Sequence, residues 1–269
     1  MKIRNLLSKI YAKGGSVLGR KNYFDVPLVR ALGYLLVPVL CLYAFGLPLA
    51  ADYFFARANN ATASDQGQKA YLDLQLALKL SPSNDIYHRA YAQINLAVAS
   101  SLGQGGSAED RDKITRLVSQ GVREARVAVD LNPGDWENAS TAGQIYQSVV
   151  GFLPPEKEGG PDAKTFAVRY LELAVKLDPF SPVRRLDLGG FYYNERDAEK
   201  ALAGALKAAE LKPDFANAHY SLAAVYKATG DTVKLKLELA ETLRTLPADS
   251  PYRAGIEQEL KSLETPTKK

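Results

Sequence analysis

The chain has 269 residues, one cysteine, two histidines and a formal net charge of +4. The charge is uneven: residues 1–30 hold seven Lys or Arg and one Asp, a net +6, so residues 31–269 carry −2. A nucleic-acid-binding protein places its positive charge on the folded domain, so this distribution argues against a nucleic-acid partner. Because the single cysteine is Cys41, residues 52–269 can form neither a disulfide nor a thiolate metal site.

Residues 31–51 form an uncharged apolar run, ALGYLLVPVLCLYAFGLPLAA, with the length of a transmembrane helix. Pro38 is expected to kink this helix. Because the basic segment 1–30 precedes the run, the positive-inside rule predicts a cytoplasmic N-terminus and places the rest of the chain across the membrane. A cleavable signal peptide is the alternative, but the apolar run is too long and its leader is about thirty residues. We therefore expect an uncleaved anchor, followed by a linker at 52–64.

From residue 65 onward one local pattern recurs, a helix-forming segment that ends in leucine and proline. Its successive ends read KLSP, DLNP, KLDP, ELKP and TLP, with prolines at Pro82, Pro133, Pro179, Pro213 and Pro247. The last three prolines lie 34 residues apart, the period of the tetratricopeptide repeat (TPR). The chain resembles this family, which implies an all-α, right-handed solenoid of antiparallel helix pairs. Such solenoids bind other molecules through their surfaces.

The repeats differ in length. The unit beginning at Pro182 matches the family closely, with Gly189 and Ala201 small enough to allow its two helices to cross. The unit beginning at Trp136 carries an insert at 152–162 before a second helix predicted at 163–177. In the unit beginning at Asp85, both helices extend around an insert at 103–110 and should project roughly 12 Å beyond the stack.

The ends of the repeat domain are predicted as follows. Residues 66–82 resemble a second helix without a first one, and Tyr252–Leu263 form an amphipathic capping helix. The predicted TPR domain therefore covers 65–264, and 265–269 are expected to be a disordered tail.

No residue set in the sequence indicates catalysis, a cofactor or a metal. His88 and His219 fall at the same repeat position, which favours a packing role. The glycine-rich stretches at 103–106 and 159–160 lack the preceding strand and the following lysine of a phosphate-binding loop. We therefore expect a protein that is not an enzyme and uses no cofactor.

The resemblance implies a binding surface, because positions 2, 5, 9, 12 and 13 of the first helix line the concave face in TPR proteins. Here these positions are rich in amides and aromatic rings, and the candidate groove residues are Arg89, Gln93, Glu137, Gln144, Gln147, Tyr193, Asn194, Asn217, Tyr220 and Lys227. Family members that bind a C-terminal carboxylate use Lys and Asn at positions 5 and 9, whereas this chain offers only Arg89 with Gln93. An extended peptide held by amide hydrogen bonds and tyrosine stacking fits better. The alternative is that these residues form an ordinary helix surface.

A narrower resemblance lies in stretches such as NDIYHRAYAQINLAVASSL and LKPDFANAHYSLAAVYKATGD. They are similar to repeat regions of bacterial membrane proteins, notably from the candidate phyla radiation, some of which carry O-antigen ligase or polymerase-like membrane domains. The resemblance implies a repeat domain on the extracytoplasmic side of a bacterial inner membrane. It does not transfer the ligase or polymerase activity, because this chain shows one apolar segment rather than a multi-helix catalytic part.

The leading hypothesis is a single-pass scaffold or adaptor that binds protein partners in the bacterial cell envelope. The alternative is an accessory subunit of a membrane glycan polymerase or ligase system, which positions the enzyme or the polysaccharide. An enzyme is a third, weaker hypothesis.

Overall fold

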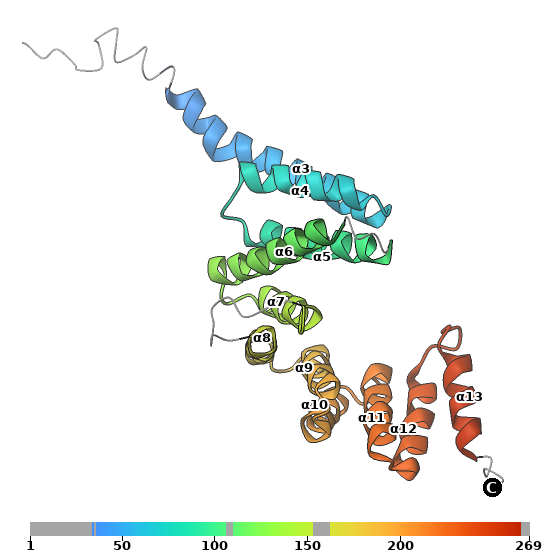
Figure 1. Cartoon of the computed structure of the whole chain (residues 1–269). Helices are drawn as coiled ribbons and strands as arrows, with labels where there is room; N and C mark the ends of the chain where they lie inside the picture. Colours follow the sequence, from blue (N-terminus) through green and yellow to red (C-terminus); the bar gives the residue numbers. More distant parts are fainter. Residues whose placement is uncertain (1–33, 35, 106–109, 153–161, 265–269) are drawn as a thin grey trace, which may run out of the picture.

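The computed structural model describes residues 34, 36–105, 110–152 and 162–264, and within these ranges it contains helices and no strand. Figure 1 shows the helices side by side in a curved row that begins at α3 and ends at α13. After a π-helical turn, η2 (Leu42–Gly46), the helices are α3 (Leu47–Ala63), α4 (Gly67–Leu80), α5 (Asp85–Gln104), α6 (Arg111–Leu131), α7 (Trp136–Ser148), α8 (Ala163–Leu177), α9 (Pro182–Asn194), α10 (Ala198–Leu211), α11 (Ala216–Thr229), α12 (Thr232–Thr245) and α13 (Arg253–Glu264).

The helices pack as consecutive pairs, α3 with α4 through α11 with α12, and α13 packs on α12. This confirms the predicted solenoid of helix pairs, including the second helix at 163–177 and the C-terminal helix. The extension of α5 to Gln104 and the start of α6 at Arg111 also agree with the sequence. The tail at 265–269, the basic segment 1–30 and parts of both inserts (106–109 and 153–161) lie outside the described residues.

Short polar side chains begin most of these helices. Asp135 Oδ1 accepts a hydrogen bond of 2.7 Å from the backbone N–H of Glu137, and Asp197 and Asp231 do the same for the third residue of their helices. Such caps satisfy N–H groups that have no partner inside the helix. Together with the prolines that follow each second helix, they explain why the predicted boundaries match the observed ones.

Small residues set the distance between paired helices. A Cβ added to Gly189 would lie 3.4 Å from the Ala201 carbonyl oxygen, which confirms the crossing predicted at this pair. The tighter position is Gly204, where an added Cβ would lie 2.9 Å from the Gly189 Cα and 3.0 Å from the Arg185 carbonyl oxygen. Backbone atoms cannot move aside as a flexible side chain can, so the α9–α10 crossing depends on Gly204.

The predicted linker at 52–64 is wrong, since these residues continue α3 and pack along α4. The second helix seen in the sequence at 66–82 is therefore not alone: α3 is its partner. Arg57 Nε donates to Asp73 Oδ2 at 2.7 Å, and Asp73 is only 2 % exposed. This hydrogen bond lowers the pKa of Asp73 despite its burial. The apolar run and the first repeat helix form one helix, so no turn in the sequence marks where the repeat helix begins.

The helix that contains α3 is also the candidate membrane span. Within the described residues, one helix, Leu36–Ala63, is long and apolar enough to cross a membrane. Its irregular turn η2 lies just before Pro48, which has no N–H to donate to the carbonyl four residues earlier. The helix is therefore irregular at Leu42–Gly46, one to two turns after Pro38, where the sequence predicts a kink.

The two histidines make equivalent contacts. His88 places Nδ1 at 2.7 Å from Glu124 and Nε2 at 2.9 Å from the Pro82 carbonyl oxygen, and His219 faces Glu238 and the Pro213 carbonyl in the same way. Both ring nitrogens thus face acceptors, which the protonated imidazolium satisfies and the neutral ring cannot. Burial opposes the charge, but the bonds to carboxylate and carbonyl oxygens outweigh it, so the pKa of each histidine is raised.

These contacts predict that the histidines stabilise the fold in acid more than in base. Because each pKa is raised on folding, the stabilisation is complete below the unfolded value of about 6.5 and is lost as pH rises through the folded value. We expect the free energy of unfolding of the double variant His88→Gln/His219→Gln to lie furthest below that of the wild-type chain near pH 6. The difference between the two should shrink toward pH 9. Urea unfolding of the detergent-solubilised chain, followed by circular dichroism, measures this. A constant difference across the range would contradict the assignment.

Candidate functional site

The candidate groove residues all lie on α5, α7, α9 and α11, the first helices of successive pairs. These helices contact one another in order, α5 with α7, α7 with α9 and α9 with α11. The structure therefore brings the predicted residues onto one continuous row of helices, but the row divides into two parts with different chemistry.

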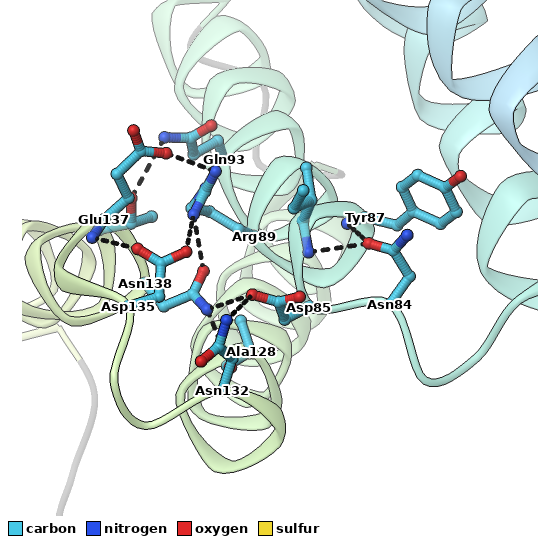
Figure 2. Close-up of polar contacts among 12 residues, drawn as sticks. Asn84, Asp85, Tyr87, Arg89, Gln93, Ala128, Asn132, Asp135, Glu137 and Asn138 are labelled. Atoms are coloured by element: carbon cyan, nitrogen blue, oxygen red, sulfur yellow. Dashed lines mark hydrogen bonds and ion pairs between the residues drawn. The ribbon is translucent and has the colours of Figure 1, made fainter.

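In the N-terminal part, between α5 and α7, polar side chains bind one another. Figure 2 shows Arg89 of α5 among Asp135, Glu137 and Asn138 at the start of α7. Arg89 Nη1 donates to Asp135 Oδ2 at 3.0 Å and to Asn138 Oδ1 at 2.9 Å, and Nη2 pairs with Glu137. The Arg89 charge is thus neutralised by the neighbouring repeat. It links two repeats, and it is not free to bind a ligand carboxylate.

Asn138 completes this α5–α7 network from within the core. It is 1 % exposed, and its Nδ2 donates to Asp85 Oδ2 at 2.7 Å and to the Ala128 carbonyl oxygen at 3.1 Å. The predicted residue Gln93 makes one long contact of 3.5 Å to Thr141 Oγ1 and is otherwise exposed. Of the candidates in this part, Gln93 and the exposed edge of Glu137 remain accessible.

In the central part, five predicted residues surround one hollow. It has a volume of about 350 Å³ and lies between α7, α9 and α11, and its lining includes Gln144, Gln147, Tyr193, Asn194 and Tyr220. Tyr193 is 41 % exposed and Tyr220 is 51 % exposed. A Cβ added to Gly190, which also lines the hollow, would meet nothing within 4 Å. This central hollow is therefore open, with two aromatic rings and three amides on its walls.

One carboxylate that the sequence reasoning missed also lines the central hollow. Asp187 Oδ2 accepts from Arg184 Nη1 at 2.8 Å, and the Arg184 guanidinium lies 4.5 Å from the centre of the Trp136 ring. Burial raises the pKa of Asp187, and the pairing with Arg184 offsets this only in part. Neither residue occupies a groove position of the family, so the repeat correspondence could not indicate them.

A second hollow of about 730 Å³ adjoins the central hollow at Tyr220, which lines both. Asn217 lies on its α11 side, and Tyr252, Gly255 and Glu259 line it from the C-terminal segment. Lys227 Nζ donates to Glu259 Oε1 at 2.7 Å. The helix α13, predicted only as a cap, therefore also forms a wall of the groove and neutralises the predicted cation at its end.

A larger hollow, of about 880 Å³, lies away from the predicted residues. It is lined by the tip of the α3–α4 pair and by the extended parts of α5 and α6, with Tyr71, Leu72, Ile94 and Leu117 among its apolar side chains. The added length of α5 and α6 contributes part of its lining, such as Leu102 and Lys113. Among the described residues, no group of three His, Cys, Asp or Glu side chains could hold a metal ion.

The Arg89 network predicts a variant that affects stability rather than binding alone. Arg89→Ala leaves Asp135 and Asn138 without their shared donor, so we expect the free energy of unfolding to fall by about 2–3 kcal/mol. The matched control is Gln93→Ala, one turn further along α5, which should change it by less than about 0.5 kcal/mol. Urea unfolding of both variants measures the difference. Equal stability of the two would show that Arg89 does not link the repeats.

No protein-family model and no curated protein sequence matches the chain. Solved structures do match it. TTC0263, a thermophilic TPR protein of Thermus thermophilus, shares 19 % identity over 80 % of this chain and 99 % of its own, with a TM-score of 0.57. PilW, a type IV pilus biogenesis factor, shares 15 % identity over 80 % and 90 %, with a TM-score of 0.57. YrrB, described as a TPR protein with an unusual peptide-binding site, shares 15 % identity over 78 % and 90 %, with a TM-score of 0.50.

At these identities the likeness concerns the fold. The described part of the chain has the all-α tetratricopeptide-repeat fold, and its first helix, Leu36–Ala63, begins with an apolar stretch.

Proposed function

We propose that this protein is a membrane-anchored, non-enzymatic scaffold whose repeat groove binds an extended segment of a partner protein in the bacterial cell envelope. The observation that carries the proposal is the central hollow, where Tyr193 and Tyr220 stand exposed beside the amides of Gln144, Gln147 and Asn194. Amide groups can both donate to and accept from a peptide backbone, and tyrosine rings supply contact area at low cost in conformational entropy.

The charges of the groove indicate what kind of segment it takes. Arg89 is paired with Asp135, Asp187 with Arg184, and Lys227 with Glu259. A ligand charge placed there would have to displace a partner already in position. We therefore infer a segment that presents uncharged polar and apolar side chains, rather than a free C-terminal carboxylate. YrrB, with its peptide-binding site, is a precedent for this use of the fold at low sequence identity.

The membrane part of the proposal rests on the apolar helix and its flanks. Large apolar side chains such as Phe45 and Leu49 are 74 % and 71 % exposed, which a protein in water rarely tolerates in a row. The basic segment 1–30 precedes this helix, so we propose a cytoplasmic N-terminus and a repeat domain on the extracytoplasmic side of the inner membrane.

Filling the central hollow should abolish partner binding without unfolding the protein. Gly190→Leu adds a good helix former at a position that lines the hollow and where an added Cβ meets nothing within 4 Å, so the side chain extends into the hollow. We expect proteins crosslinked to the tagged chain in its native membrane to be reduced about tenfold or more, a loss of at least about 1.4 kcal/mol of binding.

The matched control for this experiment is Gly103→Leu, an exposed glycine of α5 where an added Cβ makes only ordinary contact with Ile114. It should retain every crosslinked partner. If Gly190→Leu also retains them, the binding surface lies elsewhere on the molecule. If a lipid-linked glycan copurifies through the hollow instead of a protein, the accessory-subunit function in glycan assembly replaces the peptide scaffold, since exposed tyrosines and amides also suit sugars.

The predicted topology has its own test. In spheroplasts treated with protease, the repeat domain should be degraded while an epitope placed before residue 30 and a cytoplasmic marker protein survive. Survival of the repeats until the inner membrane is opened would reverse the proposed orientation.

A further inference from the structure

The apolar helix and the first repeat are parts of one helix. It runs without a break from Leu36 to Ala63, and its second half is the first helix of the α3–α4 pair. The change of environment along it is sharp: Leu49 is 71 % exposed, whereas Ala51 and Ala58 are fully buried. Figure 1 shows this helix extending beyond α4 at the N-terminal end of the row.

Contacts with two helices, α4 and α5, fix α3 in the repeat domain. Arg57 pairs with the buried Asp73 of α4, and the Tyr87 hydroxyl of α5 donates to Asp52. The rings of Phe55 and Tyr87 lie 4.9 Å apart. Because these contacts begin at the residue that follows the apolar run, no flexible segment separates the apolar half of the helix from the repeats.

The same contacts place the end of α4 and the start of α5 beside the end of the apolar run. Ala51 forms one buried cluster with Ala77 of α4 and Tyr87 of α5, and Leu80 packs against it. The apolar run 31–51 would measure about 30 Å as a helix, the thickness of the hydrocarbon core of a bilayer. With this run in the membrane, the α4–α5 turn at 81–84 lies at the level of the lipid headgroups.

The side chains exposed near this level suit a lipid interface. Tyr53 is 61 % exposed, Ile86 is 42 % exposed and Leu76 is 38 % exposed, and Lys79 is exposed one turn after Leu76. Tyrosine and lysine beside apolar side chains are typical of the boundary between hydrocarbon and water. The same positions hold the polar residues Lys207, Glu210 and Asn217 around the α10–α11 turn, but Leu173, Lys176 and Val183 around the α8–α9 turn. What distinguishes the first repeat is therefore its place beside the end of the apolar run, where Ala51 packs with Ala77 and Tyr87.

We propose that this edge of the first repeat, formed by Tyr53, Leu76, Lys79, Ile86 and the turn 81–84, rests on the membrane surface. The solenoid then leaves the bilayer as a rigid extension of its anchor, with the later repeats held away from the lipid. This inference rests on the proposed membrane anchor and adds a second membrane contact to it.

Fluorescence quenching by lipid nitroxides tests the inference on the full chain in phosphatidylcholine–phosphatidylglycerol vesicles. A dye on the native Cys41 reports insertion and should be quenched by nitroxides on the acyl chains. In the variant Cys41→Ser/Ser83→Cys, the dye should be quenched by nitroxides on the headgroups. The matched control Cys41→Ser/Asp214→Cys carries the dye at the equivalent turn of the last full repeat and should stay bright. Ser83 and Asp214 are both exposed, so neither label disturbs packing.

The outcomes separate the two proposals. If Cys41 is quenched and Ser83 is not, the anchor stands and the first repeat does not touch the membrane. If Cys41 is not quenched, the anchor itself is wrong. Equal quenching of Ser83 and Asp214 would mean that the whole solenoid lies on the lipid, which contradicts a rigid extension away from it.

Discussion

The close approach of the two helices in the α5–α6, α7–α8 and α9–α10 pairs is the constraint on which this structure depends. A Cβ added at Gly143 would lie 2.7 Å from the Leu171 side chain, and one added at Gly121 would lie 2.3 Å from the Leu96 side chain. A Cβ added at Gly204 would lie 2.9 Å from backbone. A helix pair with such contacts cannot bury its remaining apolar face alone, so it must stack on a neighbour. The order of the helices along the arc, and therefore the row of first helices that forms the groove, follows from this requirement.

Much of this architecture could be predicted because it depends on local sequence features: prolines, small residues and capping side chains. In the first repeat, these local features were not enough to predict the first helix. Leu47–Pro48 stands 34 residues before Pro82, and Ala58, Ala70 and Ala77 occupy the small-residue positions of a complete unit. The apolar run ends at Ala51, where this unit begins, and no turn separates the two, so the sequence predicts a linker at 52–64 where the structure has the first helix of the unit. Residue 51 marks the end of the apolar run, but it is not the end of a helix, since α3 continues to Ala63.

The row of first helices that carries the candidate residues could be predicted from the repeat correspondence, but which of their side chains are paired could not. Arg89 and Asp135 lie 46 residues apart, and nothing in their local sequence shows that they pair. The same holds for Lys227 with Glu259 across 32 residues. These pairs depend on the angle between successive repeats, which is set by packing. Tyr193 and Tyr220 remain free of such pairing because rings that line an open hollow need no partner of opposite charge.

The separation of paired charges from free aromatic and amide groups has a consequence for binding. Ion pairs that are already formed contribute to the angle between repeats and add little attraction for a ligand, since a new charge must replace an existing partner. For the proposed scaffold, binding then depends on shape, amide hydrogen bonds and ring contacts, all of which require the groove to be held at a fixed curvature. In the proposed arrangement, the continuous helix Leu36–Ala63 supplies such a fixed frame on the membrane side, and α13 lines the groove at the other end.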